Sequence, residues 1–397
     1  MTTYKMKSEA SQKILQGYKL ITEEDFLSGQ GIENEEEGQR ITLTQANGEF
    51  LAQAIVGRQH KGFAWIYSTR ADQYFTREFF EYCLVQAIDQ RFASFDLQKT
   101  NAFRLFNGEG DGVGGFTLDY YDGYLQINWY SRGIYAYRQW LNHYLQASPY
   151  DFKGCYQTLR FDLTGDEAAI QHLWGDQAPQ PLKILENGVS FAIYLGQDWM
   201  TGIFTDQRDV RLFISQQAQG ESLLNLFAYT GAFSLVAALA GIEKTVSVDV
   251  ANRSRQGITD NFSLNGINLA ESDHEIRIMD VFDYLRYAKR HQLQFDWVVC
   301  DPPTYARTKK YVFSADRDYP SLAEELFTLT KPGGMTIIST NHSGYDSNDF
   351  RQEMIEVANQ HPGKCQLIQS FDLPEDYPTS EDPQSQYLKV LVFYRTC

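Results

Sequence analysis

The residues Leu223-Leu-Asn-Leu-Phe227-Ala-Tyr-Thr-Gly231-Ala decide the fold, because they join an apolar run to a helix-forming run through a turn of small residues. The next apolar run ends at Asp249, nineteen residues after Thr230. Adjacent parallel strands end at one edge of a sheet, where a turn glycine lets a nucleoside cofactor approach and an acid accepts its ribose hydroxyls. The turn departs from the Gly-x-Gly-x-x-Gly pattern of dinucleotide sites. A cofactor without a phosphate therefore fits it better, and S-adenosylmethionine (SAM) is one.

Outward from this stretch, apolar and helical runs alternate after Ile184. Such alternation is typical of βαβ units around a parallel sheet. We therefore predict an α/β domain over residues 184–397. Its expected strands are residues 223–227, 245–249, 275–279, 295–301, 335–340 and 387–394, and its expected helices include residues 232–240 and 253–264.

Two further strand ends in this domain carry carboxylates. Asp280 follows the run 275–279, where a third strand end is placed to contact an adenine. Asp301-Pro-Pro-Thr-Tyr305 directly follows an apolar strand. The paired prolines fix an extended turn without backbone donors, so that carbonyl groups and the Asp301 carboxylate are left to face a substrate nitrogen.

The chain before this domain has a different character. Short β-rich runs divided by glycine signals between Arg40 and Arg70 predict hairpins of a small barrel or sheet over residues 1–72. An amphipathic helical pattern over residues 73–95 opens an α+β middle domain, which we place at residues 73–183. The glycine-rich run 108–115 lacks the Gly-Lys-Ser/Thr of a phosphate loop and precedes a strand, so it predicts a turn and a hairpin.

Composition limits the functional classes. The chain has 397 residues, of which 43% are hydrophobic, and this content is typical of folded domains. Neither a long apolar run nor a signal peptide is evident, so we expect a cytoplasmic protein without a membrane partner. The five scattered cysteines predict neither a disulfide framework nor a metal site. A formal charge of −16 argues against binding nucleic acid through the overall field, so any such site must be a local basic patch.

The order of these motifs resembles the class I SAM-dependent methyltransferases, and more narrowly the bacterial ribosomal RNA methyltransferases of the RlmI type. Three segments carry the narrower resemblance, and together they make it cover nearly the whole chain. Residues 104–121 are similar to the middle-domain signature of that family. Residues 201–208 resemble the stretch that leads into its catalytic domain. Asp376-Tyr377-Pro378, followed by Tyr387-Leu-Lys389, resembles its C-terminal pattern, with Tyr387 where histidine is common.

The resemblance implies an N-terminal PUA RNA-binding domain, a middle domain and a Rossmann-like catalytic domain that uses SAM. Asp206 and Gln207 would border the cofactor pocket, and Arg208 is a candidate partner for a carboxylate. The residues implied to line that pocket are Phe227, Tyr229, Gly231, Asp249, Asp280 and Asp301.

One segment departs from the family. Carbon-5 of cytosine is a weak nucleophile, so cytosine-5 enzymes add a cysteine thiolate to carbon-6. The family has that cysteine in a Ser-Cys-Ser-Gly segment, where this chain has Asn341-His342-Ser343-Gly344. Cys300 precedes Asp301 in an apolar strand, so their side chains should point to opposite faces, with Cys300 in the core.

Without that thiol, a nitrogen with its own lone pair, such as one of guanine, becomes the expected methyl acceptor. Asp301 would accept hydrogen bonds from the base, Tyr305 would stack on it, and His342 or Asn341 would orient it. A related branch of guanine methyltransferases of large-subunit RNA also resembles the Asp-Pro-Pro-Thr segment. Basic residues after this segment suit phosphate contacts. These predicted RNA-binding residues are Arg307, Lys309, Lys310 and Arg317.

These observations favour a SAM-dependent methyltransferase for a base of RNA, most of all 23S ribosomal RNA, and they leave a homodimer open. Two alternatives remain. A catalytically silent SAM-binding protein that binds RNA would explain the missing cysteine. A methyltransferase for proteins or small molecules would explain the acidic charge.

Overall fold

The structure is a computed structural model that describes residues 2–59, 62–307 and 311–397. The chain divides into two compact units. The first unit comprises Met1–Leu185, Tyr194–Thr201 and Glu375–Ser385. The second comprises Glu186–Ile193, Gly202–Pro374 and Gln386–Cys397. No helix in the described ranges has the length and apolar character that crossing a bilayer requires.

The first unit begins with a five-stranded sheet in the order β1-β3-β4-β5-β2. Its antiparallel pairs β3–β4 and β4–β5 are the hairpins that the glycine signals predict. Its core is made of alternating inward residues such as Ile41, Leu43 and Phe63, each fully buried. The elements are β1 (Thr2–Lys5), α1 (Ser8–Gln16), β2 (Leu20–Thr22), β3 (Arg40–Thr44), β4 (Phe50–Gln59) and β5 (Gly62–Ser68).

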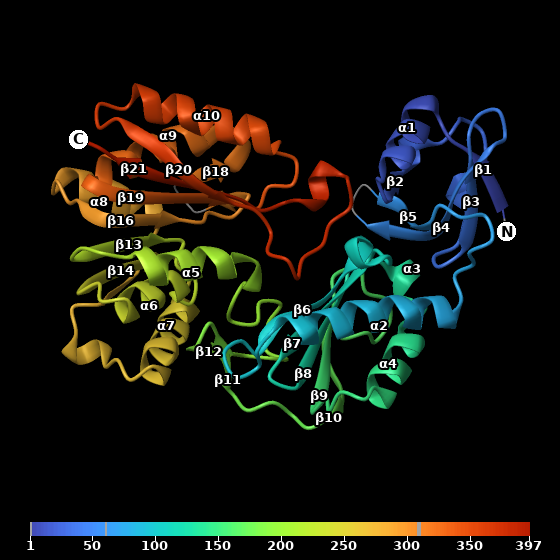
Figure 1. Ribbon diagram of the computed structural model, residues 1–397, viewed down its shortest axis with the longest axis horizontal. Coiled ribbons are helices and arrows are strands. Elements are labelled where there is room, and N and C mark those ends of the chain that lie inside the picture. The colour runs from blue at the N-terminus through green and yellow to red at the C-terminus, as the bar shows by residue number, and fades with distance from the viewer. Residues whose placement is uncertain (1, 60–61, 308–310) are drawn as a thin grey trace. The chain divides into compact units, whose positions relative to one another are not determined.

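A second five-stranded sheet of this unit has the order β10-β9-β8-β7-β6. Helix α2 lies along this sheet and is the predicted amphipathic helix (Figure 1). The glycine-rich run forms a short 3₁₀ turn, Gly108–Asp111, before the β7–β8 hairpin, so the turn-and-hairpin prediction is confirmed. The elements are α2 (Arg77–Ser94), β6 (Ala102–Asn107), β7 (Phe116–Tyr121), β8 (Tyr124–Trp129), α3 (Arg132–Tyr135), α4 (Arg138–Ala147), β9 (Gly154–Leu159) and β10 (Ile170–Gly175).

The segment Glu375–Ser385 belongs to the first unit although it lies near the end of the chain. The backbone N–H of Arg104 donates to Asp376 Oδ2 at 2.9 Å, and the Arg104 guanidinium lies 4.4 Å from the centre of the Tyr377 ring. A Cβ atom at Gly110 would come within 1.8 Å of the Pro378 carbonyl oxygen, so only glycine permits this approach. The segments 104–121 and 376–378, which carry the family resemblance, are therefore in contact.

The second unit is built on a seven-stranded sheet in the order β15-β14-β13-β16-β19-β21-β20. Strands β15, β14, β13, β16 and β19 pair in parallel, while β21 pairs antiparallel with both β19 and β20. The strands are β13 (Ser222–Leu226), β14 (Lys244–Asp249), β15 (Glu275–Ile278), β16 (Phe295–Cys300), β19 (Thr330–Thr340), β20 (Cys365–Phe371) and β21 (Lys389–Arg395). The predicted α/β domain with a parallel sheet is confirmed.

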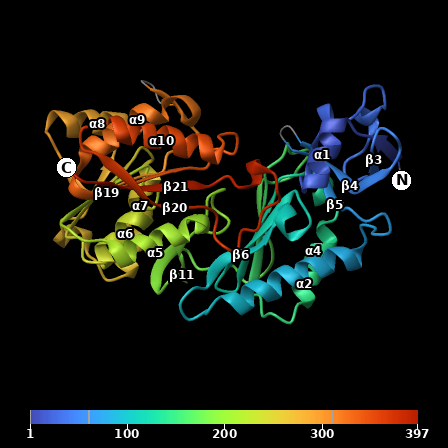
Figure 2. The same cartoon turned by 45° about the horizontal axis from the view of Figure 1, so that its top comes forward.

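Helices cover both faces of this sheet. Helices α5, α6 and α7 lie on one face and α8, α9 and α10 on the other (Figures 1 and 2). Their bounds are α5 (Arg208–Gln217), α6 (Ala232–Leu239), α7 (Asn252–Leu264), α8 (Val281–Arg290), α9 (Ala315–Leu329) and α10 (Ser347–Gln360). In the described part of the chain from residue 182 onward, four short strands lie outside the seven-stranded sheet: β11 (Leu182–Glu186), β12 (Val189–Ile193), β17 (Tyr305–Arg307) and β18 (Val312–Ser314).

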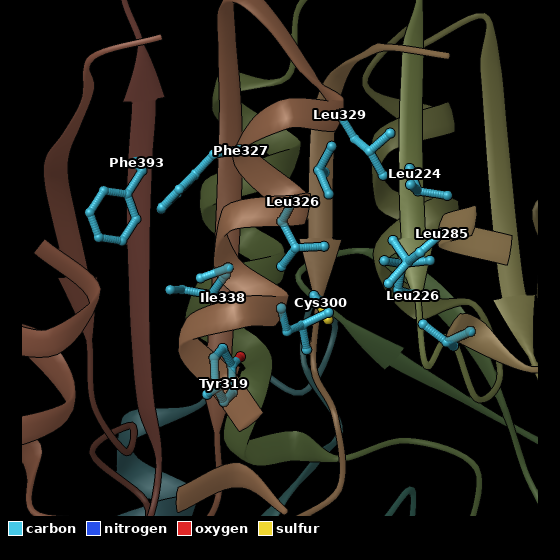
Figure 3. Packing of buried hydrophobic residues seen from close by; sticks show 14 of the residues in the cluster. Leu224, Leu226, Leu285, Cys300, Tyr319, Leu326, Phe327, Leu329, Ile338 and Phe393 are labelled. Atoms are coloured by element: carbon cyan, nitrogen blue, oxygen red, sulfur yellow. The ribbon is translucent and has the colours of Figure 1, made fainter. Parts of the chain in front are cut away.

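The core beneath α8, α9 and α10 contains Cys300. Its side chain points into the cluster that includes Leu326 and Ile338 (Figure 3). Cys300 is fully buried, and burial raises the pKa of its thiol well above the usual range. The prediction that Cys300 is a core residue is confirmed.

The strand order reverses at β13. From β13 the chain moves to β14 and β15 on one side, then returns to β16 and β19 on the other. Ligands of open parallel sheets bind at the carboxyl ends of the strands beside such a reversal. The topology therefore locates the site at the ends of β13, β14, β16 and β19.

Candidate active site

The turn after β13 has an unusual backbone. Phe227, Tyr229 and Gly231 have φ values of 57°, 49° and 71°. Left-handed conformations of residues other than glycine cost free energy and cluster at ligand sites. Gly231 also lies close to helix α7, since a Cβ atom there would be 2.9 Å from Ile258 Cγ1. The turn is thus a tight, specified loop between β13 and α6.

Asp249 at the end of β14 is fixed by this turn. Its Oδ2 accepts the backbone N–H of Tyr229 at 2.8 Å, and its Oδ1 accepts that of Ala251 at 2.8 Å. Each carboxylate oxygen can accept a second hydrogen bond. The side chain is therefore oriented in advance, with acceptor capacity left for two hydroxyl groups of a ribose.

Asp280 has a structural task that the sequence did not reveal. It is the N-cap of α8, where its Oδ1 accepts the backbone N–H groups of Phe282 at 2.8 Å and Asp283 at 3.4 Å. A capping carboxylate satisfies otherwise unpaired N–H groups of the first helical turn. The position of Asp280 after the third strand is as expected, while its contact with an adenine stays a prediction.

Asp301 is the centre of a polar cluster. The register that pairs Cys300 with Ile338 brings Asp301 beside Ser339, whose hydroxyl donates to Asp301 Oδ1 at 2.5 Å. Gln207 Nε2 donates to Asp301 Oδ2 at 3.2 Å and to the Ser339 hydroxyl oxygen at 3.3 Å. Burial raises the pKa of the Asp301 carboxyl to about 6, and repulsion from Asp206 adds to this effect.

Gln207 completes the cluster as an acceptor. The residue is 3% exposed, and within the described part of the chain its Oε1 has no hydrogen-bond partner. Because Nε2 is committed to Asp301 and Ser339, Oε1 is the atom left for a ligand. A buried acceptor without a donor is costly. This atom therefore fits an N–H or O–H group of a bound molecule.

The start of β21 holds two parts of the site. The Tyr387 hydroxyl donates to Asp206 Oδ2 at 2.8 Å. The buried ammonium of Lys389 donates to the His342 carbonyl at 2.9 Å and to the Tyr387 carbonyl at 3.2 Å. Tyrosine in place of the common histidine thus has a direct partner in Asp206.

The segment 340–344 after β19 is also fixed. Asn341 Oδ1 accepts the Thr304 hydroxyl at 2.9 Å, which links the segment to the turn after β16. The His342 ring is partly buried, and among the described residues its Nδ1 has no hydrogen-bond partner. A Cβ atom at Gly344 would lie 3.1 Å from His342 Cε1, so glycine gives the ring room.

The predicted RNA-side residues differ in their surroundings. Tyr305 is 56% exposed, and Arg307 is exposed in the same short strand, β17. Arg317 donates from Nε and Nη2 to the two carboxylate oxygens of Asp318, each at 2.8 Å, so its charge is largely neutralised locally. The two predicted lysines lie outside the described residues: Lys309 and Lys310.

Phe227 and Arg208, which were predicted to lie at the cofactor pocket, are also packed within the protein. The Phe227 ring lies 6.3 Å from Phe282 and 6.5 Å from Phe313, so it packs against the core. Arg208 is the first residue of α5 and only 4% exposed. Their contacts with a cofactor stay predictions.

Sequence reasoning missed Ser339 and Lys389 as parts of the site. The sequence did contain a signal for Ser339, because the predicted strand 335–340 had to end beside the strand that precedes Asp301. Lys389 is part of the segment that carries the family resemblance, but no local pattern indicates its bond to the carbonyl of His342, 47 residues earlier in the chain.

Comparisons with known proteins agree with this geometry. Residues 104–394 match the S-adenosylmethionine-dependent methyltransferase family, and residues 5–69 match a PUA-like domain. The chain therefore belongs to the SAM-dependent methyltransferase family and is an enzyme of that class.

Particular relatives extend over almost the whole chain. A Bacillus subtilis protein provisionally named ribosomal RNA large subunit methyltransferase YwbD is 41% identical over 98% of both chains. Ribosomal RNA large subunit methyltransferase I of Yersinia pseudotuberculosis is 29% identical over 89% of both chains. A crystal structure of SMU.776, provisionally assigned as a methyltransferase and complexed with SAH, has a TM-score of 0.89 and 34% identity, covering 99% of this chain and 100% of its own.

SAM is the cofactor, and the residues present fit it. The Asp249 carboxylate suits ribose hydroxyls, and the buried Gln207 Oε1 suits an N–H donor. The tight turn at Gly231 brings the backbone close without offering a phosphate cradle of glycines. When bound, SAM supplies a methyl group on a positively charged sulfur. An electron pair of the substrate can bond to this methyl carbon while the sulfur leaves as the neutral thioether of SAH.

Proposed function

We propose that the enzyme methylates a base of large-subunit ribosomal RNA, and that the acceptor atom is a nitrogen with its own lone pair, such as one of guanine. The names of the relatives support this substrate, above all the Bacillus subtilis relative that is 41% identical over 98% of the chain. The PUA-like match over residues 5–69 supports an RNA-binding N-terminal part.

The positions of the cysteines are the reason for proposing a nitrogen, and not carbon-5 of cytosine, as the methyl acceptor. Methylation of cytosine carbon-5 needs a thiolate at carbon-6. Cys300 is buried in the core with a raised pKa, so it supplies no thiolate. Cys365 pairs with Arg395, at the opposite end of β21 from Lys389. Cys397 contacts the Pro362 carbonyl beyond that same end.

The remaining cysteines give no alternative nucleophile. Cys83 and Cys155 are buried in the first unit, and burial raises the pKa of Cys83 to about 11. Burial raises the pKa of the Cys155 thiol even further. All five cysteines of the chain are thus accounted for without a thiolate beside Asp301.

The chemistry then rests on acceptors. Asp301 accepts an N–H of the base, positions its lone pair toward the methyl group, and takes the proton that the nitrogen loses as the N–C bond forms. A carboxyl pKa of about 6 keeps most of Asp301 ionised at neutral pH, while it can still receive a proton in the reaction. Tyr305 stacks on the base, and His342 orients it.

Two other functions are distinguishable from this one. A catalytically silent SAM-binding protein would bind SAM and RNA and transfer no methyl group. A methyltransferase for proteins or small molecules would keep its activity when Arg307, Lys309 and Lys310 are neutralised. The raised pKa of the Asp301 carboxyl, about 6, favours an active enzyme over the silent protein, because a carboxyl that takes up a proton near neutral pH suits proton transfer.

The test is methyl transfer from labelled SAM to RNA from cells that lack this protein, followed by mass spectrometry of the nucleosides. We expect a methylated guanosine or another N-methyl nucleoside in the large-subunit RNA. A 5-methylcytidine product would overturn the choice of nitrogen. The absence of any methylated nucleoside despite SAM binding would favour the silent protein.

Three finer points belong to the same proposal. We place the enzyme in the cytoplasm, where ribosomal RNA is its substrate. The domain boundaries after residues 72 and 183 are proposed from the change in sequence pattern. A homodimer is the proposed assembly, and light scattering at working concentrations checks it.

A further inference from the structure

Trp199 and Arg160 form an aromatic surface in the first unit that the proposed reaction does not use. Trp199 is 48% exposed, although it is a large apolar residue. The Arg160 guanidinium lies 5.4 Å from the centre of the Trp199 ring and 5.7 Å from that of Tyr130. An arginine that lies over two aromatic rings, one of them half-exposed, forms with them a surface that suits stacking by a further planar group.

Hydrogen bonds hold this arrangement in place. Arg160 Nη2 donates to the Trp199 carbonyl at 2.8 Å, and Nε donates to Asn128 Oδ1 at 3.4 Å. The Trp199 backbone N–H donates to Asp198 Oδ1 at 2.6 Å. Because these bonds fix the backbone of Trp199 and the side chain of Arg160 before any ligand arrives, less conformational freedom is lost on binding.

The loop that carries Trp199 is anchored at several further points in the first unit. The Tyr194 backbone N–H donates to the Thr201 carbonyl at 2.7 Å, which closes the loop at its base. The Thr201 hydroxyl lies 3.1 Å from the Tyr121 hydroxyl on β7. Gln197 Nε2 donates to Gln180 Oε1 at 2.8 Å. The loop is therefore a fixed part of the surface.

The charge of Arg160 distinguishes this surface from its neighbour. In the described residues, the side-chain hydrogen bonds of Arg160 go to neutral oxygens, so its positive charge is not neutralised by a carboxylate. Arg132 also lies over an aromatic ring, Phe161, at 4.7 Å, but it donates to both carboxylate oxygens of Glu167. Only the first of these two arginines offers its charge to a polyanion.

We propose that Trp199, backed by Arg160, is a stacking site for an unpaired nucleotide of the substrate RNA. The ring gives contact to any base through its π-face, and the arginine attracts the adjacent phosphates. Trp199 lies eight residues before Gln207 in the chain, and Gln207 donates to Asp301. The inference rests on the proposed RNA substrate and adds the site for a nucleotide outside the reaction centre.

The experiment measures RNA binding separately from methyl transfer. The probe is a fluorescein-labelled, single-stranded 12-nucleotide RNA of mixed sequence, titrated with the full-length protein in the presence of SAH. We expect Trp199→Ala to raise the Kd about 5- to 100-fold, which is the usual effect of losing one stacked base. Trp199→Phe should keep most of the affinity, because the ring is retained.

Matched controls separate stacking from misfolding and from general charge. Tyr82 on α2 is 62% exposed, so Tyr82→Ala removes an exposed ring elsewhere and should leave the Kd unchanged. The Kd for SAH and the melting temperature should also stay unchanged in Trp199→Ala. Its loss of affinity should be equal at all salt concentrations, because stacking releases no counterions.

The outcomes distinguish this inference from the proposed function. If wild-type protein methylates ribosomal RNA while Trp199→Ala binds the probe and the RNA as wild type does, the stacking site is overturned and the function stands. If binding depends on Trp199 but no RNA is methylated, the stacking site stands and the function fails. A wild-type protein that does not bind the single-stranded probe overturns the stacking site outright.

Discussion

The two halves of the strand-end edge in the second unit are built differently. At the ends of β13 and β14, the contacts are local and involve the backbone. The backbone N–H of Tyr229, in the strained turn, donates to Asp249. At the ends of β16 and β19, side chains meet from segments far apart in the chain, since Gln207 and Ser339 both bond to Asp301. In both halves the carboxylate that follows a strand end can be recognised in the sequence, whereas the contacts of Gln207 and Ser339 with Asp301 cannot, because they join segments far apart in the chain.

The largest expected effect comes from a substitution at the ends of β16 and β19 that leaves the ends of β13 and β14 unchanged. Asp301→Asn keeps the shape of the side chain but removes its ability to take a proton. We expect kcat to fall about 10²- to 10⁴-fold, as for the loss of a general base. Single-turnover methyl transfer to RNA, with the Kd for SAH measured in parallel, checks this. A Kd that rises as much as the rate falls would move Asp301 to the cofactor side.

The next largest effect is expected from a substitution at the ends of β13 and β14. Asp249→Ala removes the acceptor for two hydroxyl groups and the partner of the Tyr229 N–H. We expect the Kd for SAM to rise about 10- to 100-fold, the range for lost hydrogen bonds to a charged group. Calorimetric titration measures it, and the melting temperature shows how much is due to the turn. Unchanged affinity would remove the cofactor assignment of Asp249.

A pH profile sharpens the comparison further. The pKa of Asp301 is raised to about 6, so kcat/KM should fall about tenfold for each unit of pH below this value as the carboxylate is protonated. The folded pKa lies above the unfolded value of 3.8, so the folded protein binds the proton more tightly. The free energy of unfolding should therefore decrease as pH rises from about 4 to 6. Urea titrations of wild type and Asp301→Asn check this, since the variant should lack that decrease.

A substitution with a smaller expected effect tests whether β21 positions the segment that follows β19. Lys389→Met removes the donor to the His342 carbonyl while nearly keeping the volume of the side chain. We expect kcat to fall roughly tenfold through misplacement of segment 340–344, with the Kd for SAH unchanged. Lys389→Arg, which retains donors, should recover part of the rate. Equal losses of rate in both variants would mean that packing alone matters there.

The smallest effects compare two arginines near the site. Arg317 is paired with Asp318, so Arg317→Gln should change the Kd for RNA by less than about twofold. Arg307 is exposed, and its substitution by Gln should weaken binding by about threefold at low salt. Anisotropy titrations at two salt concentrations measure both. A larger effect of Arg317 would show that RNA displaces Asp318.

The sequence predicted the second unit well because its signals are local. Alternating apolar strands and helices specified a parallel sheet, and strand alternation alone put Cys300 into the core, opposite to Asp301. The candidate site was predicted only in part. Asp249 and Asp301 follow directly from strand ends, whereas the capping task of Asp280 depends on where α8 begins.

What the sequence could not predict depends on contacts across long stretches of chain. Tyr387 bonds to Asp206, 181 residues earlier, and no periodicity encodes such a pair. The pairing of Arg317 with Asp318 was within reach of the sequence, but adjacent opposite charges only pair when the helix start orients them toward each other. Tertiary packing decides these cases.

The division of the chain into two units determines which segments a chimera between two such enzymes must exchange. The path passes from one unit to the other after Leu185, Ile193, Thr201, Pro374 and Ser385. A chimera that exchanged only Met1–Leu185 with a relative would combine the Arg104 segment of one protein with the Asp376 segment of the other. Exchange of the first unit between relatives therefore requires its three segments, Met1–Leu185, Tyr194–Thr201 and Glu375–Ser385, to be exchanged together.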